Sequence, residues 1–282
     1  MATVDLRPMT LGEVLDRTFT LYRENFLLFV GIVALPNLLT LLFNFGVLLF
    51  QRNAAVTGTP PHLPSSGAIG GIVLGGVTGM LLLLLAVGIA HAATVSAVSD
   101  LYLGRDTSVS DAYGRAKGSI LIVIAILLMS GLATIVGLIF LIVPGIYLAC
   151  RLAVSVPVAI VEQQSPVASM ERSMELTKGF AGQMFLLLLL VAVLQWVVSA
   201  LIQAPAMFFS ITAVVAKHQP SLGVSVYSYL AGFVAQVLVG PIGTISASLM
   251  YYNLRVRKEG FDIQHLLGSL GNVPRPLSME PR

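Results

Sequence analysis

Long runs of apolar residues alternate with short clusters of charged residues along this chain. The first run, residues 26–50, contains 25 residues and no charged side chain. An α-helix needs roughly 20 apolar residues to cross the hydrocarbon core of a bilayer, which is about 30 Å thick. This run is therefore long enough to span a membrane. The same criterion, applied to the whole chain, predicts six spans, at residues 26–50, 69–99, 119–143, 145–162, 182–204 and 223–252.

The limits of the fourth and fifth spans have two interpretations each. The fourth is short, contains Arg151 and Pro157, and follows the pair Pro144-Gly145. It therefore either crosses the bilayer fully or stops within it. The fifth either ends before Pro205 or continues past it, because proline lacks the backbone N–H and often ends or kinks a helix.

Basic residues gather in alternate connecting segments, which predicts an orientation. The N-terminal segment, the segments after spans two and four, and the C-terminal segment hold 13 of the 16 lysines and arginines. The other connecting segments hold only Arg52 and Lys217. Cytoplasmic segments of membrane proteins carry the excess of basic residues. We therefore expect one membrane domain, residues 1–262, in the cell membrane with both termini cytoplasmic, and a flexible tail at 263–282.

The composition excludes an ordinary soluble domain. Hydrophobic residues make up 56% of the chain and the mean hydropathy is +0.91, whereas soluble domains are roughly half apolar. The net charge of +3 does not indicate nucleic acid, because the basic residues stand at the ends of apolar runs. The partner that this placement predicts is the lipid bilayer, including anionic lipids. Cys150 is the only cysteine, so no intramolecular disulfide forms.

A spacing of polar residues recurs in three of the charged segments. Thr10 and Glu13 have the pattern of a capping box, which predicts the start of a helix. In each segment a serine or threonine precedes an arginine by seven residues, in the pairs Thr10 and Arg17, Ser108 and Arg115, and Ser165 and Arg172. The pattern predicts a short amphipathic interfacial helix followed by two spans, used three times. The alternative is that topology alone places an arginine before each of these spans.

Three ionisable residues form a candidate intramembrane polar site. Arg151 is the one basic residue inside a predicted span, where an arginine costs roughly 2.5–3.5 kcal/mol on insertion scales. It marks either an anion or lipid-headgroup site or a paired structural arginine near a helix end. Glu162 lies roughly 16 Å from it along an unbroken helix, so the two do not pair within one helix. His91, in the second span, is either a proton relay or a packing histidine that bonds to a neighbouring helix.

Other residues in the spans indicate packing or a polar pathway. Glycines at four-residue spacing in the second span favour close helix packing, at Gly71, Gly75 and Gly79. Amide side chains either line a pathway or bond between helices, at Asn37, Asn44, Gln195, Gln203 and Gln236. Trp196 lies near the middle of the fifth span, away from the interfacial belt where tryptophan is usually enriched.

Motifs of enzymes are missing from the sequence. It contains no phosphate-binding glycine loop after a strand, no HExxH, no GxSxG and no cysteine cluster. The four histidines are scattered, without a carboxylate at metal-ligand spacing. We therefore predict no catalytic residues, no metal and no cofactor.

Three stretches carry a family resemblance: residues 6–17 (LRPMTLGEVLDR), the region 143–179 that begins VPGIYL, and residues 251–262 (YYNLRVRKEGFD). They resemble the bacterial family named for the membrane domain of glycerophosphoryl diester phosphodiesterase. The resemblance implies a multi-pass membrane domain, which some relatives fuse to a soluble phosphodiesterase. The metal-binding histidines and glutamates of that enzyme have no counterpart here, so its activity is not carried over.

The sequence thus predicts an all-α, polytopic membrane protein with six transmembrane helices and short interfacial helices on the cytoplasmic side. The leading function is non-enzymatic: a scaffold, or a module that binds lipid or a membrane or cytoplasmic protein partner. The alternative is a transporter or channel for a small anionic or lipid-like substrate. A third hypothesis, an intramembrane hydrolase, requires catalytic groups that converge only in the folded chain.

Overall fold

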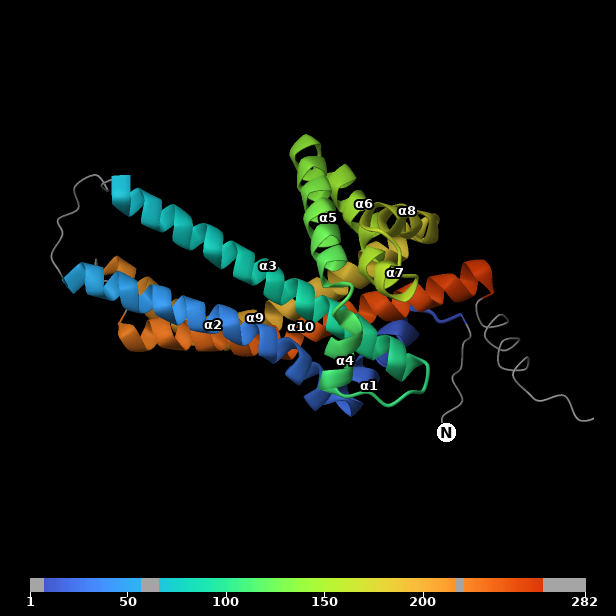
Figure 1. Cartoon of the computed structure of the whole chain (residues 1–282), viewed down its shortest axis with the longest axis horizontal. Helices are drawn as coiled ribbons and strands as arrows, with labels where there is room; N and C mark the ends of the chain where they lie inside the picture. The colour runs from blue at the N-terminus through green and yellow to red at the C-terminus, as the bar shows by residue number, and fades with distance from the viewer. Residues whose placement is uncertain (1–7, 57–65, 217–220, 261–282) are drawn as a thin grey trace, which may run out of the picture.

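Figure 1 shows a computed structural model of the chain, which describes residues 8–56, 66–216 and 221–260. Over these residues the fold consists of α-helices, with no strand. The helices are α1 (Leu11–Glu24), α2 (Phe26–Val56), α3 (Ser66–Tyr102), α4 (Val109–Ala116), α5 (Ile120–Phe140), α6 (Ile142–Leu152), α7 (Ser155–Val161), α8 (Pro166–Thr177), α9 (Ala181–Val215) and α10 (Leu222–Glu259). The predicted tail at 263–282 lies outside the described residues.

Within the described residues, six helical segments are long and apolar enough to cross a membrane, which confirms the predicted multi-pass all-α class. They are Phe26–Phe50, Val73–Tyr102, Ile120–Phe140, Ile142–Val161, Ala181–Ala213 and Leu222–Glu259. The fourth segment combines α6 and α7, which a short turn separates.

Prolines shape the spans less than the sequence suggested. Helix α9 continues through Pro205 to Val215, which favours the longer of the two interpretations of span five. Pro144 lies in the first turn of α6, where a backbone N–H has no partner within the helix, so proline is tolerated there. The break between α5 and α6 therefore falls at Leu141, which is extended with φ −162° and ψ 141°. The expected break at the Pro144-Gly145 pair is not observed.

Two glycines allow α5 and α6 to form a tight hairpin. A Cβ on Gly137 would lie 2.9 Å from the Cα of Gly145, and a Cβ on Gly145 would lie 2.6 Å from the backbone nitrogen of Leu138. Real Cβ atoms do not approach other atoms this closely, so both positions require glycine. The predicted glycine ridge of α3 behaves differently: a Cβ at Gly71 or Gly75 would meet no atom within 4 Å.

Of that ridge, only Gly79 packs closely within the described chain, because a Cβ there would lie 2.8 Å from the Phe43 ring of α2. The helix with the most packing partners is α10 instead. It contacts α1, α2, α3, α7, α8 and α9. Its second half is almost fully buried, and Tyr251 and Tyr252 are among the largest buried side chains.

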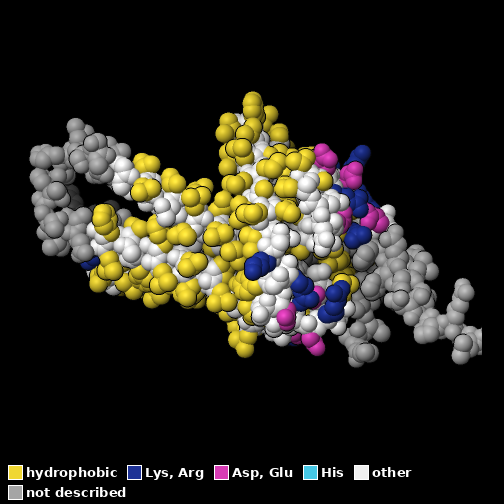
Figure 2. Space-filling model, in the orientation of Figure 1, with side chains coloured by type: hydrophobic (Ala, Val, Ile, Leu, Met, Phe, Trp, Pro, Cys, Tyr) yellow, Lys and Arg dark blue, Asp and Glu magenta, His cyan; other side chains and the backbone are white. Residues whose placement is uncertain are grey.

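The short helices α1, α4 and α8 lie near one end of the molecule, where Figure 2 shows most of the Lys, Arg, Asp and Glu side chains; we call it the charged end. Thr10 and Glu13 form a capping box at α1, and Ser108 and Asp111 form another at α4. Each short helix is followed by a spanning hairpin. The order of elements therefore has the predicted unit of one short helix and two spans three times.

The spanning helices form two groups that diverge from the charged end. Helices α2, α3, α9 and α10 extend together in one direction, and the α5–α6 hairpin projects in another (Figure 1). The core lies where the groups meet, and includes Phe29, Val98, Ile126, Leu187 and Leu249. Beyond this junction the two groups separate.

Candidate functional site

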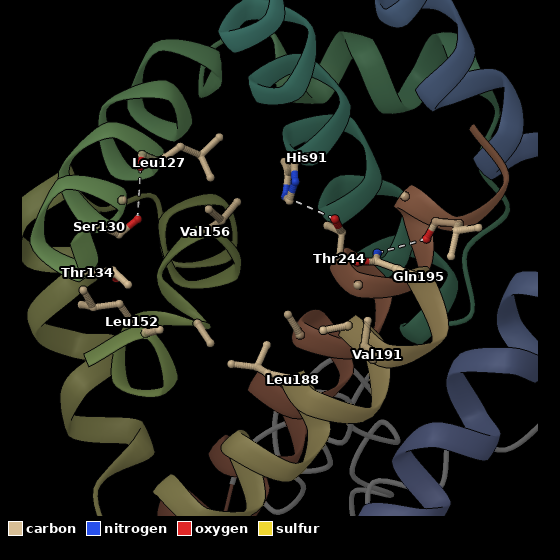
Figure 3. A pocket seen from close by; sticks show the side chains of 18 of the residues that line it. His91, Leu127, Ser130, Thr134, Leu152, Val156, Leu188, Val191, Gln195 and Thr244 are labelled. Atoms are coloured by element: carbon tan, nitrogen blue, oxygen red, sulfur yellow. Dashed lines mark hydrogen bonds between the residues drawn. The ribbon is translucent and has the colours of Figure 1, made fainter. Parts of the chain in front are cut away.

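A cavity of about 990 Å³ lies between the two groups of helices. Its lining comes from α3, α5, α6, α7, α9 and α10. Figure 3 shows α5, α6 and α7 on one side of the opening and α9 and α10 on the other, with α3 between them. Ligand pockets usually measure roughly 300–1,000 Å³, so the cavity is large enough for a small ligand or part of a lipid.

The polar lining of this central cavity is uncharged. It consists of one histidine, two amides and four hydroxyls: His91, Gln195, Gln236, Ser130, Thr134, Ser199 and Thr244. No Lys, Arg, Asp or Glu is among the described residues that line it. The other lining residues are apolar or glycine, so the site combines hydrogen-bonding groups with apolar walls.

Three hydrogen bonds fix part of this polar lining. His91 Nδ1 and Thr244 Oγ1 are 3.2 Å apart and join α3 to α10. Gln195 Nε2 donates to the carbonyl of Val239 at 3.3 Å, which joins α9 to α10. These bonds agree with the packing interpretation of His91. Ser130 donates to the Leu127 carbonyl of its own helix at 3.5 Å, the upper limit for such a bond.

Other polar atoms of the lining are available to a ligand. His91 Nε2, Gln195 Oε1 and the Thr134 hydroxyl have no hydrogen-bond partner among the described residues. Figure 3 shows Ser130 and Thr134 across the opening from Gln195 and Thr244. A ligand between them can therefore meet donors and acceptors on both sides.

Glycines of α10 make room for the amides. A Cβ on Gly243 would lie 3.2 Å from Gln195 Nε2, and one on Gly240 would lie 3.1 Å from Gln236 Nε2. A Cβ at either position would require the amide to shift by a few tenths of an ångström. The local sequence of α10 thus opens the wall at the level where the amides gather.

The polar groups lie deep in the spanning helices. At a rise of about 1.5 Å per residue, His91 is roughly 16 Å along α3 from Tyr102, and Thr244 is roughly 22 Å along α10 from Glu259. With one edge of the hydrocarbon core at Tyr102, a core about 30 Å thick has His91 near its middle, together with Thr244, which is hydrogen-bonded to His91.

Large apolar side chains border the cavity on its outside. Trp196 is 72% exposed and Ile135 is 55% exposed, and both line the cavity. In a membrane such surfaces face lipid. The cavity therefore has an apolar border on its lipid-facing side.

Arg151 does not line the cavity. It lies in the last turn of α6, where Nη1 donates to the Tyr147 hydroxyl at 3.1 Å and Nη2 donates to the Met174 carbonyl of α8. Its own carbonyl accepts hydrogen bonds from Ser173 at 2.8 Å and Thr177 at 3.2 Å. These hydrogen bonds connect α6 to α8. They favour the interpretation of Arg151 as a structural arginine near a helix end.

Glu162 belongs to an ion-pair cluster at the charged end. Its carboxylate lies 3.4 Å from Arg172 Nε and 3.9 Å from Arg255 Nε, and it accepts a hydrogen bond from Tyr251 at 3.0 Å. Glu259 pairs with both arginines. Burial lowers the pKa of Arg172, but its hydrogen bond to Glu259 and the charge of Glu162 outweigh this and raise the pKa above its ordinary value. The cluster joins α7, α8 and α10.

The interfacial arginines have a recurring partner. Arg115 Nη2 lies 2.6 Å from Asp100, a carboxylate near the end of α3 that is 5% exposed. Arg172 pairs with Glu162, which ends α7. Arg115 and Arg172 thus both contact an acid at the end of the hairpin that precedes them. Arg17 is exposed on α1.

The structure does not bring Arg151, His91 and Glu162 into one site, because each contacts a different set of residues. Of these three residues, only His91 lines the central cavity. The hydroxyls that join it were not singled out from the sequence, because serine and threonine in spans often bond to their own helix. The position of Trp196 in the middle of a span was the clearest sign in the sequence that this region is unusual.

Comparisons of the chain with protein-family models, with curated proteins and with solved structures find no match. Among the described residues, no group of three or more His, Cys, Asp or Glu side chains is placed to hold a metal ion. The central cavity is therefore interpreted from its own geometry.

Proposed function

We propose that this protein binds an uncharged, lipid-like amphiphile in its central cavity. The headgroup would lie among the hydroxyls, amides and His91, and the chains would pass the border at Trp196 into the bilayer. The observation that carries the proposal is a cavity at mid-span that combines uncharged hydrogen-bonding groups with apolar walls.

The absence of charge from the lining described here argues for an uncharged headgroup. A phosphate or carboxylate deep in hydrocarbon loses its hydration and needs a cation to replace it. Arg151, the cation that the sequence offered for this purpose, is bound to α8 instead. Hydroxyl-rich heads, such as a sugar or a polyol, match the donors and acceptors of the lining.

Transport of a lipid-like molecule is the second candidate, and the divergence of the two helix groups favours it. Transport of a small anion has less support, because the described lining supplies no cation. A hydrolase would need a nucleophile and a base, with a third group that orients the base. The Thr244 hydroxyl lies 3.2 Å from His91 Nδ1, but no described residue bonds to His91 Nε2 to orient the ring, so the proposal contains no catalytic step.

The proposal places the protein in the cell membrane with the charged end in the cytoplasm. The support is the distribution of lysine and arginine along the sequence. The family resemblance of the sequence stays a prediction alongside it, and contributes the membrane domain without the phosphodiesterase activity.

Binding is measurable through Trp196, because it is the only tryptophan of the chain and borders the cavity. Purified protein in a polyoxyethylene detergent is titrated with a glycosyl diacylglycerol. We expect a saturable change in emission, and a several-fold weaker affinity for Gln195→Leu. The matched control is Gln203→Leu, which makes the same change on the exposed side of α9 and should bind like the unmodified protein. Equal affinities for the two variants would contradict the proposed site.

A further inference from the structure

A second cavity, of about 370 Å³, lies between α2, α3 and α10. Its polar lining is again uncharged and comprises Asn37, Thr40, Asn44, Ser228, Tyr229 and Gln236. Gln236 also lines the central cavity, and its side chain is exposed. This amide therefore borders both cavities.

The second cavity continues the central one away from the charged end. Along α10 it is lined by residues between Ser228 and Gln236, whereas the central cavity is lined by residues from Ala235 to Ala247. At about 1.5 Å per residue, Ser228 and Thr244 are roughly 24 Å apart along the helix. Together the two cavities extend along most of the apolar length of α10, and both contain polar groups.

Two amides in this region have no hydrogen-bond partner in the part of the chain that the structure describes. Asn44 and Gln236 make no hydrogen bond with any other described residue, and Asn37 uses only its Nδ2, which donates to the Val33 carbonyl at 2.8 Å. An amide in hydrocarbon is unstable without a hydrogen bond. Water or the polar part of a ligand can supply the missing hydrogen bonds.

We propose that the second cavity is a hydrated vestibule through which an uncharged, hydroxyl-bearing headgroup reaches the central cavity from the end opposite the charged end. Gln236 is the residue at which the headgroup passes from one cavity to the other. The identity of the headgroup rests on the proposed function, whereas the presence of water in the vestibule does not.

Reaction of cysteines with a water-soluble thiol reagent tests this. Cys150 is the only cysteine and is buried, so Cys150→Ala gives a background without thiols. Asn44→Cys and Gln236→Cys are compared with Leu42→Cys, which stands on the same helix as Asn44 and is 58% exposed toward lipid. The proteins are placed in phosphatidylcholine nanodiscs and treated with 2-sulfonatoethyl methanethiosulfonate.

The vestibule predicts that the cysteines at 44 and 236 react at least about tenfold faster than the one at 42, because only a thiolate in contact with water reacts. Equal, slow rates at all three positions would overturn the hydrated vestibule, whatever the result of the Trp196 titration. In a second arm, a glycosyl diacylglycerol should slow the reaction at position 236 several-fold and leave position 42 unchanged. Fast labelling that this lipid does not slow would overturn the passage of the headgroup.

Discussion

Loss of the charge on Glu162 should destabilise the protein, because this carboxylate holds three helices together. Its oxygens lie 3.4 Å from Arg172 and 3.9 Å from Arg255, and one accepts the hydroxyl of Tyr251 at 3.0 Å. The variant Glu162→Gln keeps the shape and the hydrogen bond from tyrosine. It removes the attraction to the two arginines, and its amide nitrogen replaces the oxygen that accepts hydrogen bonds from Arg172 and Gln164.

The size of the effect follows from burial. Exposed ion pairs contribute about 0–1 kcal/mol, and breaking a fully buried pair costs about 3–5 kcal/mol. The Glu162 and Arg172 side chains are 14% and 26% exposed, between these limits. Both arginines also keep Glu259 as a partner, which softens the loss. We therefore expect a loss of about 1–2 kcal/mol, which lies between the values for exposed and fully buried pairs.

Thermal unfolding in detergent measures this loss. With about 2–4 °C for each kcal/mol in a chain of this size, the apparent Tm should fall by roughly 2–8 °C. Glu171→Gln is the matched control, since it removes the same charge from an exposed position beside Arg172 and should shift the Tm by less than about 1 °C. In an Arg172→Met background the effect of Glu162→Gln should shrink, because the partner is already gone. Equal shifts for Glu162→Gln and Glu171→Gln would refute the assigned role of the cluster.

Three further substitutions have expected outcomes. Gly145→Ala places a Cβ 2.6 Å from a backbone nitrogen and should cost about 1–3 kcal/mol in thermal unfolding, whereas Gly131→Ala, with open space around it, should not lower the stability, because alanine favours a helix more than glycine by up to about 1 kcal/mol. Arg151→Met should lower the Tm through loss of its bonds to α8 but leave the lipid affinity seen by Trp196 unchanged; a lost affinity would show that this arginine acts in binding. The hydrogen bond from Ser108, and the charge of Arg115, lower the pKa of Asp111, so its contribution at α4 is present above the ordinary pKa and is lost as pH falls through the lowered one. Asp111→Asn should remove that part of the acid dependence of the Tm, and an unchanged profile would contradict this.

The class of the fold was predictable because a bilayer imposes a length and a composition on every helix that crosses it. The residues at which helices begin and end were harder to predict from the sequence. Helix α9 continues through Pro205, although proline often ends a helix, and Pro144 is tolerated because α6 begins at Ile142. Sequence alone gives neither fact.

The candidate site was only partly predictable, because it depends on how helices pair. His91 and Gln195 were recognisable as polar residues within spans. That they meet Thr244 and the Val239 carbonyl follows from the placement of α10 between α3 and α9. Arg151 was the most unusual residue by position, but a neighbouring interfacial helix, α8, supplies its partner.

The most direct test of the account compares lipids that share the same chains and differ only in headgroup charge. A glycosyl diacylglycerol and a phosphatidylglycerol, both dioleoyl, are titrated separately into purified protein while the emission of Trp196 is followed. The account predicts saturable binding of the uncharged lipid and at least about tenfold weaker binding of the anionic one, because no described cation lines the cavity. Equal or stronger binding of the anionic lipid, or no saturable binding of either, would contradict it.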